Sequence, residues 1–292
     1  MSRVLIIGAS GQVGEALHAE FLKKNNVLGL DLDPVTPDTI KADMNDIGLM
    51  EKTIGNFKPQ VILCPAAFTY VDGCEMDALK CRNVNVESPQ KIAAIAQKVN
   101  SKFIYFSSDY IFDGKDGPYD EQAKPNPLSV YGKQKLEMEK FITGNLTDFL
   151  IIRTTGVYGP EKRGKNFVLS LIKKLRNSEK IKIPVDQLGT PTYSPNIAEA
   201  IYKLIEANQR GVFNVAGSEL IGRMAFAEKI CEIFDLNKDL LIPVTTEELN
   251  QKAKRPLKGG LKIDKLLSTV SIKMFSPDEG LKDLRSKLKV ER

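Results

Sequence analysis

The glycine spacing near the start of the chain constrains the fold more than any other feature. A short apolar run, Val4-Leu5-Ile6-Ile7, leads directly into a G-x-x-G-x-x-G turn, and apolar residues then recur between positions 16 and 21. This order predicts a buried parallel strand, a tight turn and a helix. Such a turn lets the backbone approach a pyrophosphate, which then faces the helix N-terminus. The candidate phosphate-binding residues are Gly8, Gly11, Gln12, Val13 and Gly14, with an ordinary turn as the alternative.

An acidic residue at a suitable distance from the turn supports a dinucleotide site. A second apolar run, 27–30, ends at Asp31, about 20 residues beyond the glycines, as the dinucleotide fingerprint requires. A carboxylate there binds the adenosine ribose hydroxyls and repels the 2′-phosphate of NADP, and residues 32–34 contain no arginine to offset this. The sequence therefore favours NAD(H), with NADP(H) as the alternative. Asp43 is a candidate for the adenine amino group, with a turn aspartate as an equal alternative.

Strand-like and helix-like segments keep alternating through the first half of the chain. Further apolar runs end near positions 64, 107 and 153, with helical patterns between them. This regular alternation predicts an α/β fold with a doubly wound parallel sheet of the Rossmann type. Ligands of such sheets bind beyond the carboxyl ends of the strands, where Asp31, Ala66 and Ser108 all fall.

A tyrosine and a lysine four residues apart carry the catalytic prediction. Positions i and i+4 of a helix share a face, so Tyr131 and Lys135 would point the same way. A free tyrosine has a pKa of about 10, and the neighbouring ammonium is expected to lower that pKa. Ser108, at the end of a predicted strand, would hydrogen-bond the same substrate oxygen. The set suits proton transfer to a carbonyl beside a hydride carrier; the alternative is an exposed helical pair.

Composition excludes several other classes of protein. The 292 residues are 42% apolar and 27% charged with a net charge of +5, as in a globular protein of one large or two modest domains. The densest basic patch, 162–165, lacks interleaved aromatic residues, so we expect no nucleic-acid partner. No apolar run approaches the ~20 residues that span a bilayer. Because the chain start leads straight into a strand, we expect a cytoplasmic protein without membrane association.

The cysteines and the single histidine predict no metal centre. Cys64, Cys74, Cys81 and Cys231 form no Cys-x-x-Cys pair, and no histidine lies near them in the sequence. We expect reduced, mostly buried thiols without a disulfide framework. His18 falls within the first predicted helix and is interpreted as structural rather than catalytic.

With these residues in place, the chain resembles the extended short-chain dehydrogenase/reductase family over nearly its whole length, and within it the dTDP-4-dehydrorhamnose reductase branch. The resemblance is carried by G-x-x-G-Q-V-G over 8–14, S-S-D-Y-I-F-D-G over 107–114, P-L-S-V-Y-G-K-Q-K-L over 127–136, G-K-N-F over 164–167, D-Q-L-G-T-P-T over 186–192 and Arg255-Pro256. It implies a dinucleotide-binding domain over 1–158 and a smaller, mainly substrate-binding domain over 159–292, with segments that return to the Rossmann domain.

The resemblance also implies a role for each candidate site residue. Tyr131 would be the proton donor, Lys135 its activator and a ribose ligand, and Ser108 the hydroxyl that orients the carbonyl. The cofactor would be lined by Gly11, Gln12, Val13, Asp31, Asp43, Met44, Ala66 and Ala67. The sugar nucleotide would be held by Asp109, Tyr110, Asn166 and Arg255, the last beside the diphosphate, where a guanidinium makes bidentate contacts.

Several positions depart from the family pattern. The family usually has a threonine at Ser108, an asparagine-alanine pair near Cys64-Pro65, a histidine near Phe68 and often a serine at Gly259. It also has a tryptophan that packs on the sugar at Gly156, whereas this chain contains no tryptophan. These departures bear on which sugar is bound rather than on the cofactor or the reaction type.

Three functional hypotheses follow. The first is an NAD(P)H-dependent reductase of a nucleotide-linked 4-keto-6-deoxy sugar. For this enzyme the oligomeric state is left open, and a homodimer is one of the alternatives. The second is a sugar-nucleotide dehydratase or epimerase, but dehydratases need an Asp-Glu pair where Asp109 is followed by Tyr110. The third is a non-catalytic dinucleotide-binding subunit resembling methionine adenosyltransferase β. That branch retains the tyrosine and the lysine, and the missing tryptophan keeps the hypothesis open.

Overall fold

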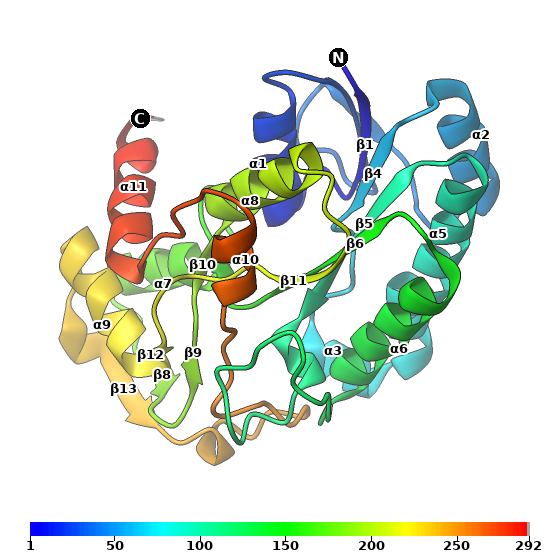
Figure 1. Ribbon diagram of the computed structural model, residues 1–292. Coiled ribbons are helices and arrows are strands. Elements are labelled where there is room, and N and C mark those ends of the chain that lie inside the picture. The colour runs from blue at the N-terminus through cyan, green and yellow to red at the C-terminus, as the bar shows by residue number, and fades with distance from the viewer. Residues whose placement is uncertain (291–292) are drawn as a thin grey trace.

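A seven-stranded parallel sheet forms the centre of the computed structural model, which describes residues 1–290 (Figure 1). Its strands lie in the order β11 (Gly211–Asn214), β6 (Phe149–Thr154), β5 (Lys102–Ser108), β4 (Val61–Cys64), β1 (Arg3–Ile7), β2 (Asn26–Asp31) and β3 (Thr39–Lys41). All neighbouring pairs are parallel. The strand order reverses between β1 and β4, which confirms the predicted doubly wound α/β fold.

Alternate residues of the central strands are buried on opposite faces of the sheet. In β1, Val4 and Ile6 belong to one apolar cluster, and Leu5 and Ile7 belong to the other, because successive side chains of a strand point to opposite faces. The first face is covered by α1 (Gln12–Phe21), α8 (Ser194–Glu206) and α10 (Asp264–Thr269), and the second by α2 (Ile47–Phe57), α5 (Ser88–Lys98) and α6 (Val130–Asn145). Because helices cover both faces of the sheet, a ligand can reach it at the edge where the strands end.

A smaller group of elements lies beside the sheet around a separate apolar cluster that includes Tyr158 and Phe226. It contains α7 (Phe167–Arg176), α9 (Arg223–Phe234), α11 (Pro277–Val290) and the parallel pair of β8 (Ile181–Pro184) and β13 (Leu241–Val244). Two short pairs complete it, β7 (Val157–Tyr158) with β10 (Thr192–Tyr193) and β9 (Leu188–Gly189) with β12 (Ile221–Gly222). Short 3₁₀ turns lie at Lys238–Leu240 and Glu247–Leu249.

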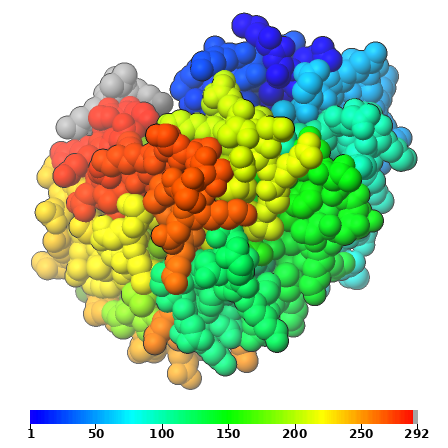
Figure 2. Space-filling view, in the orientation of Figure 1, coloured from blue at the N-terminus to red at the C-terminus, as the bar shows by residue number. Residues whose placement is uncertain are grey.

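Several segments of the second half pack on the large sheet rather than in the smaller group. α8, β11 and α10 all follow residue 158, and they contribute Ile201, Phe213 and Leu266 to the cluster on the first face of the sheet. Figure 2 shows the orange segment that contains α10 lying between the yellow and the green parts of the surface. The division into domains at residue 158 stays a prediction.

The stretch after β4 contains a disulfide that the sequence did not indicate. Between β4 and β5 the chain forms α3 (Val71–Met76), α4 (Ala78–Arg82), a π-helical turn (Asn83–Glu87) and then α5. Asp77 accepts a hydrogen bond from the Lys80 backbone and turns the chain back. This brings the Cα atoms of Cys74 and Cys81 to 5.2 Å, and the two residues form a disulfide. The prediction of reduced thiols was wrong for this pair, while Cys64 and Cys231 are free and buried.

Residues 1–290 contain neither a candidate membrane-spanning helix nor a candidate metal-binding cluster. In this part of the chain, no helix has the length and apolar character needed to span a membrane. In the same residues, no three side chains of His, Cys, Asp or Glu are grouped so that they could hold a metal ion.

Candidate active site

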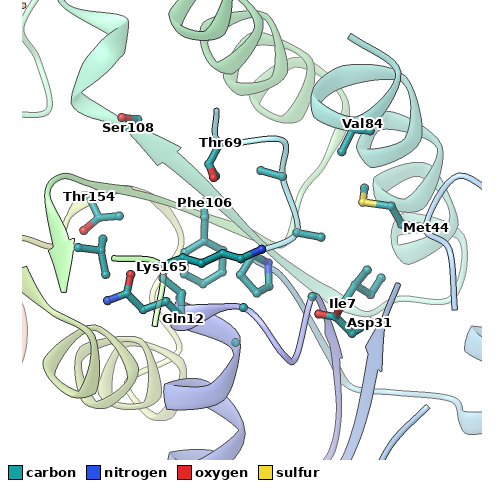
Figure 3. Close-up of a pocket in the computed structure, with 18 of the residues that line it drawn as sticks. Ile7, Gln12, Asp31, Met44, Thr69, Val84, Phe106, Ser108, Thr154 and Lys165 are labelled. Carbon is teal, nitrogen blue, oxygen red and sulfur yellow. The ribbon is translucent and has the colours of Figure 1, made fainter. Parts of the chain in front are cut away.

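A cavity of about 660 Å³ lies at the carboxyl ends of β1 and β4, where the strand order reverses. It is lined by every candidate cofactor residue: Gly8, Gly11, Gln12, Val13, Gly14, Asp31, Asp43, Met44, Ala66 and Ala67. Ser108, Tyr110, Tyr131, Lys135 and Asn166 line it too. Figure 3 shows Asp31 and Met44 at one end of this cavity and Ser108 and Thr154 at the other. The fold thus gathers residues that are up to 158 positions apart in the sequence (166 − 8).

The glycine turn forms a backbone cradle that larger side chains would fill. Gly8 has a φ of +95°, and a Cβ atom there would lie 2.7 Å from the Ala66 backbone nitrogen. A Cβ atom on Gly14 would overlap the Gly8 carbonyl oxygen. Gly11 caps α1 without a side-chain hydrogen bond, so the N–H groups of the first turn have no side-chain acceptor. A pyrophosphate fits this cradle, because its oxygens can approach the backbone and accept from those N–H groups.

Two buried hydroxyls in the same cavity lack partners. Ser107 Oγ and Thr154 Oγ1 are inaccessible to solvent and make no hydrogen bond to any part of residues 1–290. Buried polar atoms are nearly always satisfied in native proteins. Together with the glycine cradle, these atoms fit a polar ligand such as a nicotinamide dinucleotide.

An arginine from a distant segment changes the interpretation of Asp31. The Asp31 carboxylate accepts hydrogen bonds from the Ser10 and Asp33 backbones, each at 2.9 Å. Arg163 Nη2 lies 3.0 Å from the same carboxylate, and Arg163 Nε is buried with no partner in the described residues. The predicted preference for NAD(H) depended on the lack of a nearby arginine, and the fold supplies one from 132 positions along the chain. The argument against a 2′-phosphate is weakened accordingly.

The helix α6 places the candidate catalytic pair against the end of β5. Ser129 caps the helix by accepting a hydrogen bond from Gly132 N at 3.1 Å. Lys135 Nζ lies 5.6 Å from the centroid of the Tyr131 ring, so the two side chains share a face as their spacing predicts. Lys135 Nζ also donates to the Phe106 carbonyl at 2.8 Å, which directs the ammonium along β5.

The pKa values of this pair differ from the expectation. Burial raises the pKa of Tyr131 well above its ordinary value; Tyr110 and Asp109 act in the same direction, and the Ser108 hydroxyl opposes them. Burial also lowers the pKa of Lys135 to about 8. The predicted lowering of the tyrosine pKa was wrong, because loss of water around a phenolate outweighs an ammonium that is held by a backbone carbonyl. Tyr131 therefore stays protonated at neutral pH, the form that a proton donor needs.

A second cavity of about 500 Å³ adjoins the first at Tyr110, Thr155 and Gly156. It is lined by the predicted substrate residues Asp109 and Arg255 and by parts of β8, β9 and α9. Asp109 is buried, accepts a hydrogen bond from Thr155 Oγ1 at 2.7 Å, and has a pKa that is raised by burial. Tyr110 meets the Tyr131 ring edge-on, with 5.7 Å between centroids. The two cavities therefore meet beside Tyr110, whose ring packs against the candidate catalytic residue Tyr131.

Asn166 and Gly156, two positions that the resemblance singles out, each have a clear structural role. Asn166 caps α7: its Oδ1 accepts from Leu169 N at 3.1 Å, and its Nδ2 donates to the Gly159 carbonyl at 3.0 Å. Gly156, where the resemblance would place a tryptophan, has a φ of +53° that side-chain-bearing residues rarely adopt. No side chain therefore projects from position 156 where the two cavities meet.

Two arginines that line the cavities, Arg163 and Arg223, were not predicted from the sequence. Arg163 belongs to the basic patch 162–165 but carried no signal that it would reach Asp31. Arg223 opens α9, and its guanidinium lies 3.4 Å from the centroid of the Phe167 ring beside the second cavity. No motif marks either residue, because each is placed by the tertiary fold.

A Rossmann sheet whose cavity joins a glycine cradle to a serine, a tyrosine and a lysine defines the short-chain dehydrogenase/reductase class of oxidoreductases. Comparison with known families is more specific, because a model described as "RmlD substrate binding domain" matches residues 2–290. The chain belongs to this family.

Its relatives include dTDP-4-dehydrorhamnose reductases and subunits of methionine adenosyltransferase. A dTDP-4-dehydrorhamnose reductase from Aggregatibacter actinomycetemcomitans is 32% identical over 301 residues, covering 98% of this chain and 99% of the relative. Methionine adenosyltransferase 2 subunit beta from Danio rerio is 31% identical over 275 residues, covering 90% and 84%. Among solved structures, dTDP-4-dehydrorhamnose reductase from Bacillus anthracis in complex with NADP has a TM-score of 0.89 at 29% identity, covering 98% and 99% of the two chains.

Proposed function

We propose that this chain is an NAD(P)H-dependent reductase of nucleotide-linked 4-keto-6-deoxy sugars, of the dTDP-4-dehydrorhamnose reductase type. The observation that carries the proposal is that Ser108, Tyr131 and Lys135 line the same cavity as the glycine cradle. The substrate class comes from the relatives' names. We also propose a cytoplasmic location and a homodimeric assembly.

The cofactor would lie along the first cavity. The glycine turn would hold the pyrophosphate, Asp31 and Arg163 the adenosine ribose, and the small residues Ala66 and Ala67 the nicotinamide. When bound, the reduced nicotinamide supplies a hydride to the keto carbon of the substrate. NAD(H) and NADP(H) both fit, since Arg163 offsets the charge of Asp31.

The chain's own residues supply the proton. Tyr131, protonated because burial raises its pKa, donates its proton to the carbonyl oxygen as the ketone becomes an alcohol. The Ser108 hydroxyl orients that oxygen. Lys135, whose pKa is lowered to about 8, is mostly an ammonium at pH 7 and stabilises the phenolate that is left behind.

The rest of the substrate would extend into the second cavity. Residues 1–158 would then bind the dinucleotide, and residues 159–292 would mainly bind the sugar nucleotide, with Asp109, Tyr110, Asn166 and Arg255 around it. Binding of the remote nucleotide would orient the keto carbon and lower the barrier to the chemical step.

An NADH- and NADPH-consumption assay with dTDP-, UDP- and GDP-linked 4-keto sugars tests the proposal. Tyr131→Phe removes one hydroxyl and is expected to lower kcat by about 10²- to 10⁴-fold, the usual contribution of a positioned acid, with cofactor affinity retained. Tyr202→Phe is the matched control, because that hydroxyl bonds to Glu206 on α8, outside both cavities. Full turnover by the Tyr131→Phe protein would remove Tyr131 from its role.

A second candidate function is a non-catalytic dinucleotide-binding regulatory subunit. It is favoured by the 31% identity to a methionine adenosyltransferase subunit and by the glycine at 156. Copurification with a methionine adenosyltransferase, together with no reduction of any keto-sugar nucleotide, would support it. The dehydratase or epimerase alternative is disfavoured, because Tyr110 stands where dehydratases need a glutamate.

A further inference from the structure

Arg223 is a half-buried cation with no anionic partner in the described residues. Its guanidinium lies 3.4 Å from the Phe167 ring centroid and borders the second cavity. Burial lowers the pKa of Arg223 to about 10; Tyr110 acts in the opposite direction, and the nearby Arg255 lowers the pKa further. No carboxylate of residues 1–290 forms an ion pair with Arg223, and the charged side chain that acts on its pKa is another arginine, Arg255.

A buried arginine elsewhere in the chain shows how the fold treats a cation that serves structure alone. Arg153 is bound in bidentate fashion by Glu139, with nitrogen–oxygen distances of 3.0 and 2.7 Å, and donates a third hydrogen bond to the Glu121 carbonyl. A partly buried charge without such a partner is unfavourable. Its presence beside a cavity therefore points to an anion that arrives with a ligand.

Arg255, the arginine that the resemblance places near the substrate's diphosphate, is already engaged. Its Nη2 lies 2.9 Å from Asp72, its Nη1 donates to the Tyr110 hydroxyl at 2.9 Å, and its Nε donates to Gln251. Tyr110 in turn packs edge-on against Tyr131. Arg255 thus has its charge balanced and fixes a neighbour of the catalytic tyrosine.

The position of Arg223 relative to the reacting centre suits a diphosphate. The two cavities meet at Tyr110, Thr155 and Gly156, next to Tyr131. A sugar held at that junction would direct its anomeric substituent into the second cavity, away from the dinucleotide. The first charged group of a nucleotide sugar beyond the sugar is its diphosphate, and Arg223 supplies an unpaired planar donor for phosphate oxygens.

We propose that Arg223, stacked on Phe167, binds the diphosphate of the nucleoside diphosphate sugar, while Arg255 positions Tyr110. This proposal rests on the proposed function, because it assumes a nucleotide-linked substrate. It assigns the anion-binding part of the second cavity to a residue that no sequence motif marks. Phe167 holds the guanidinium plane in place, so that its N–H groups remain free for oxygen acceptors.

Calorimetric titration with dTDP, and with neutral thymidine for comparison, tests the proposal on the full chain. Arg223→Met keeps the apolar stem and removes the charge; it is expected to weaken dTDP binding about 10- to 100-fold, as loss of a charge-assisted contact does. Arg223→Lys should recover part of the loss. Thymidine and NADPH affinities should not change. Arg255→Met, matched in chemistry, should lower kcat and weaken dTDP binding less than Arg223→Met.

The melting temperature of Arg223→Met is a second measurement, and it distinguishes a ligand-binding arginine from a purely structural one. Because Arg223 has no partner to leave behind, Arg223→Met should melt at or above the temperature of the unmodified protein. Unchanged dTDP affinity in Arg223→Met, or a larger loss in Arg255→Met, would overturn the proposal while the reductase function stood. If the unmodified protein bound no dTDP, UDP or GDP, the proposed substrate class would fail, and this inference with it.

Discussion

The cofactor end and the substrate end of the site are built differently. The cofactor end uses residues at successive strand ends: Gly8 after β1, Asp31 at the end of β2 and Ala66 after β4. The substrate end is assembled from Tyr110, Phe167, Arg223 and Arg255, which belong to separate segments of the smaller group and its neighbours. Backbone recognition at the cofactor end leaves one short local motif, whereas the residues of the substrate end are scattered, and Arg223 lies outside every motif quoted for the resemblance.

One arginine of the substrate end differs from the arginines of the sheet side in how its charge is balanced. On the sheet side, Arg153 is paired with Glu139 and Arg163 with Asp31. At the substrate end, Arg255 is paired with Asp72, but Arg223 borders a cavity without an ion pair in the described residues. Substitutions on the sheet side should therefore change stability and cofactor binding, and substitution of Arg223 should change nucleotide binding.

The largest effect is expected from breaking the buried pair of the sheet side. Glu139→Gln leaves Arg153 buried without a carboxylate, since both side chains are about 5% exposed. The free energy of unfolding should fall by about 3–5 kcal/mol, the usual cost of an uncompensated buried charge. Urea denaturation measures it. The double substitution Glu139→Met, Arg153→Met should recover part of the loss, because it removes both charges.

The comparison with Arg223→Met decides whether the two arginines differ in kind. A similar loss of stability in Arg223→Met would mean that Arg223 is a structural residue like Arg153, and the contrast between the two ends would fail. If the Glu139→Gln protein were as stable as the unmodified chain, Arg153 would not depend on its carboxylate partner, and the contrast between Arg153 and Arg223 would also fail.

Features that depend on local sequence patterns could be predicted, whereas features that depend on the tertiary fold could not. The strand over 102–107, the i, i+4 pair of Tyr131 and Lys135 and the glycine turn are local patterns, and the structure has each of them. Two misses, the contact of Arg163 with Asp31 and the Cys74–Cys81 disulfide, depend on where the fold brings segments together. The pKa of Tyr131 was missed because burial, which a helical spacing cannot report, outweighs the neighbouring lysine.

A smaller effect is expected from pH, through Lys135 on the sheet side. Burial lowers its pKa from 10.5 to about 8 in the folded protein. Between these values the unfolded chain binds more protons than the folded one, so the free energy of unfolding rises with pH. The destabilisation is therefore complete below pH 8 and is relieved toward pH 10.5. A shift of this size corresponds to about 3 kcal/mol.

Lys135→Met isolates that contribution. Urea denaturation of the two proteins without cofactor, from pH 7 to 10, should show the unmodified chain gaining stability relative to the variant as the pH rises. Other tyrosines and lysines are common to both proteins, and their titration cancels in the difference. A difference that does not change with pH would mean that the Lys135 ammonium is already well solvated or paired.

The smallest effect sharpens the comparison within the cofactor end itself. Arg163 reaches that end from a distant segment, and it lies 3.0 Å from the carboxylate that would otherwise repel a 2′-phosphate. Arg163→Gln should weaken NADPH binding about tenfold, or about 1.4 kcal/mol, and NADH binding less. Lys162→Gln, with the same change in net charge one residue away, is the matched control and should leave the NADPH-to-NADH affinity ratio unchanged. Fluorescence titration measures both cofactors. Equal losses for NADPH and NADH in Arg163→Gln would show that Arg163 acts only as a partner of Asp31, and the cofactor choice would then depend on the strand-end residues that the sequence already displays.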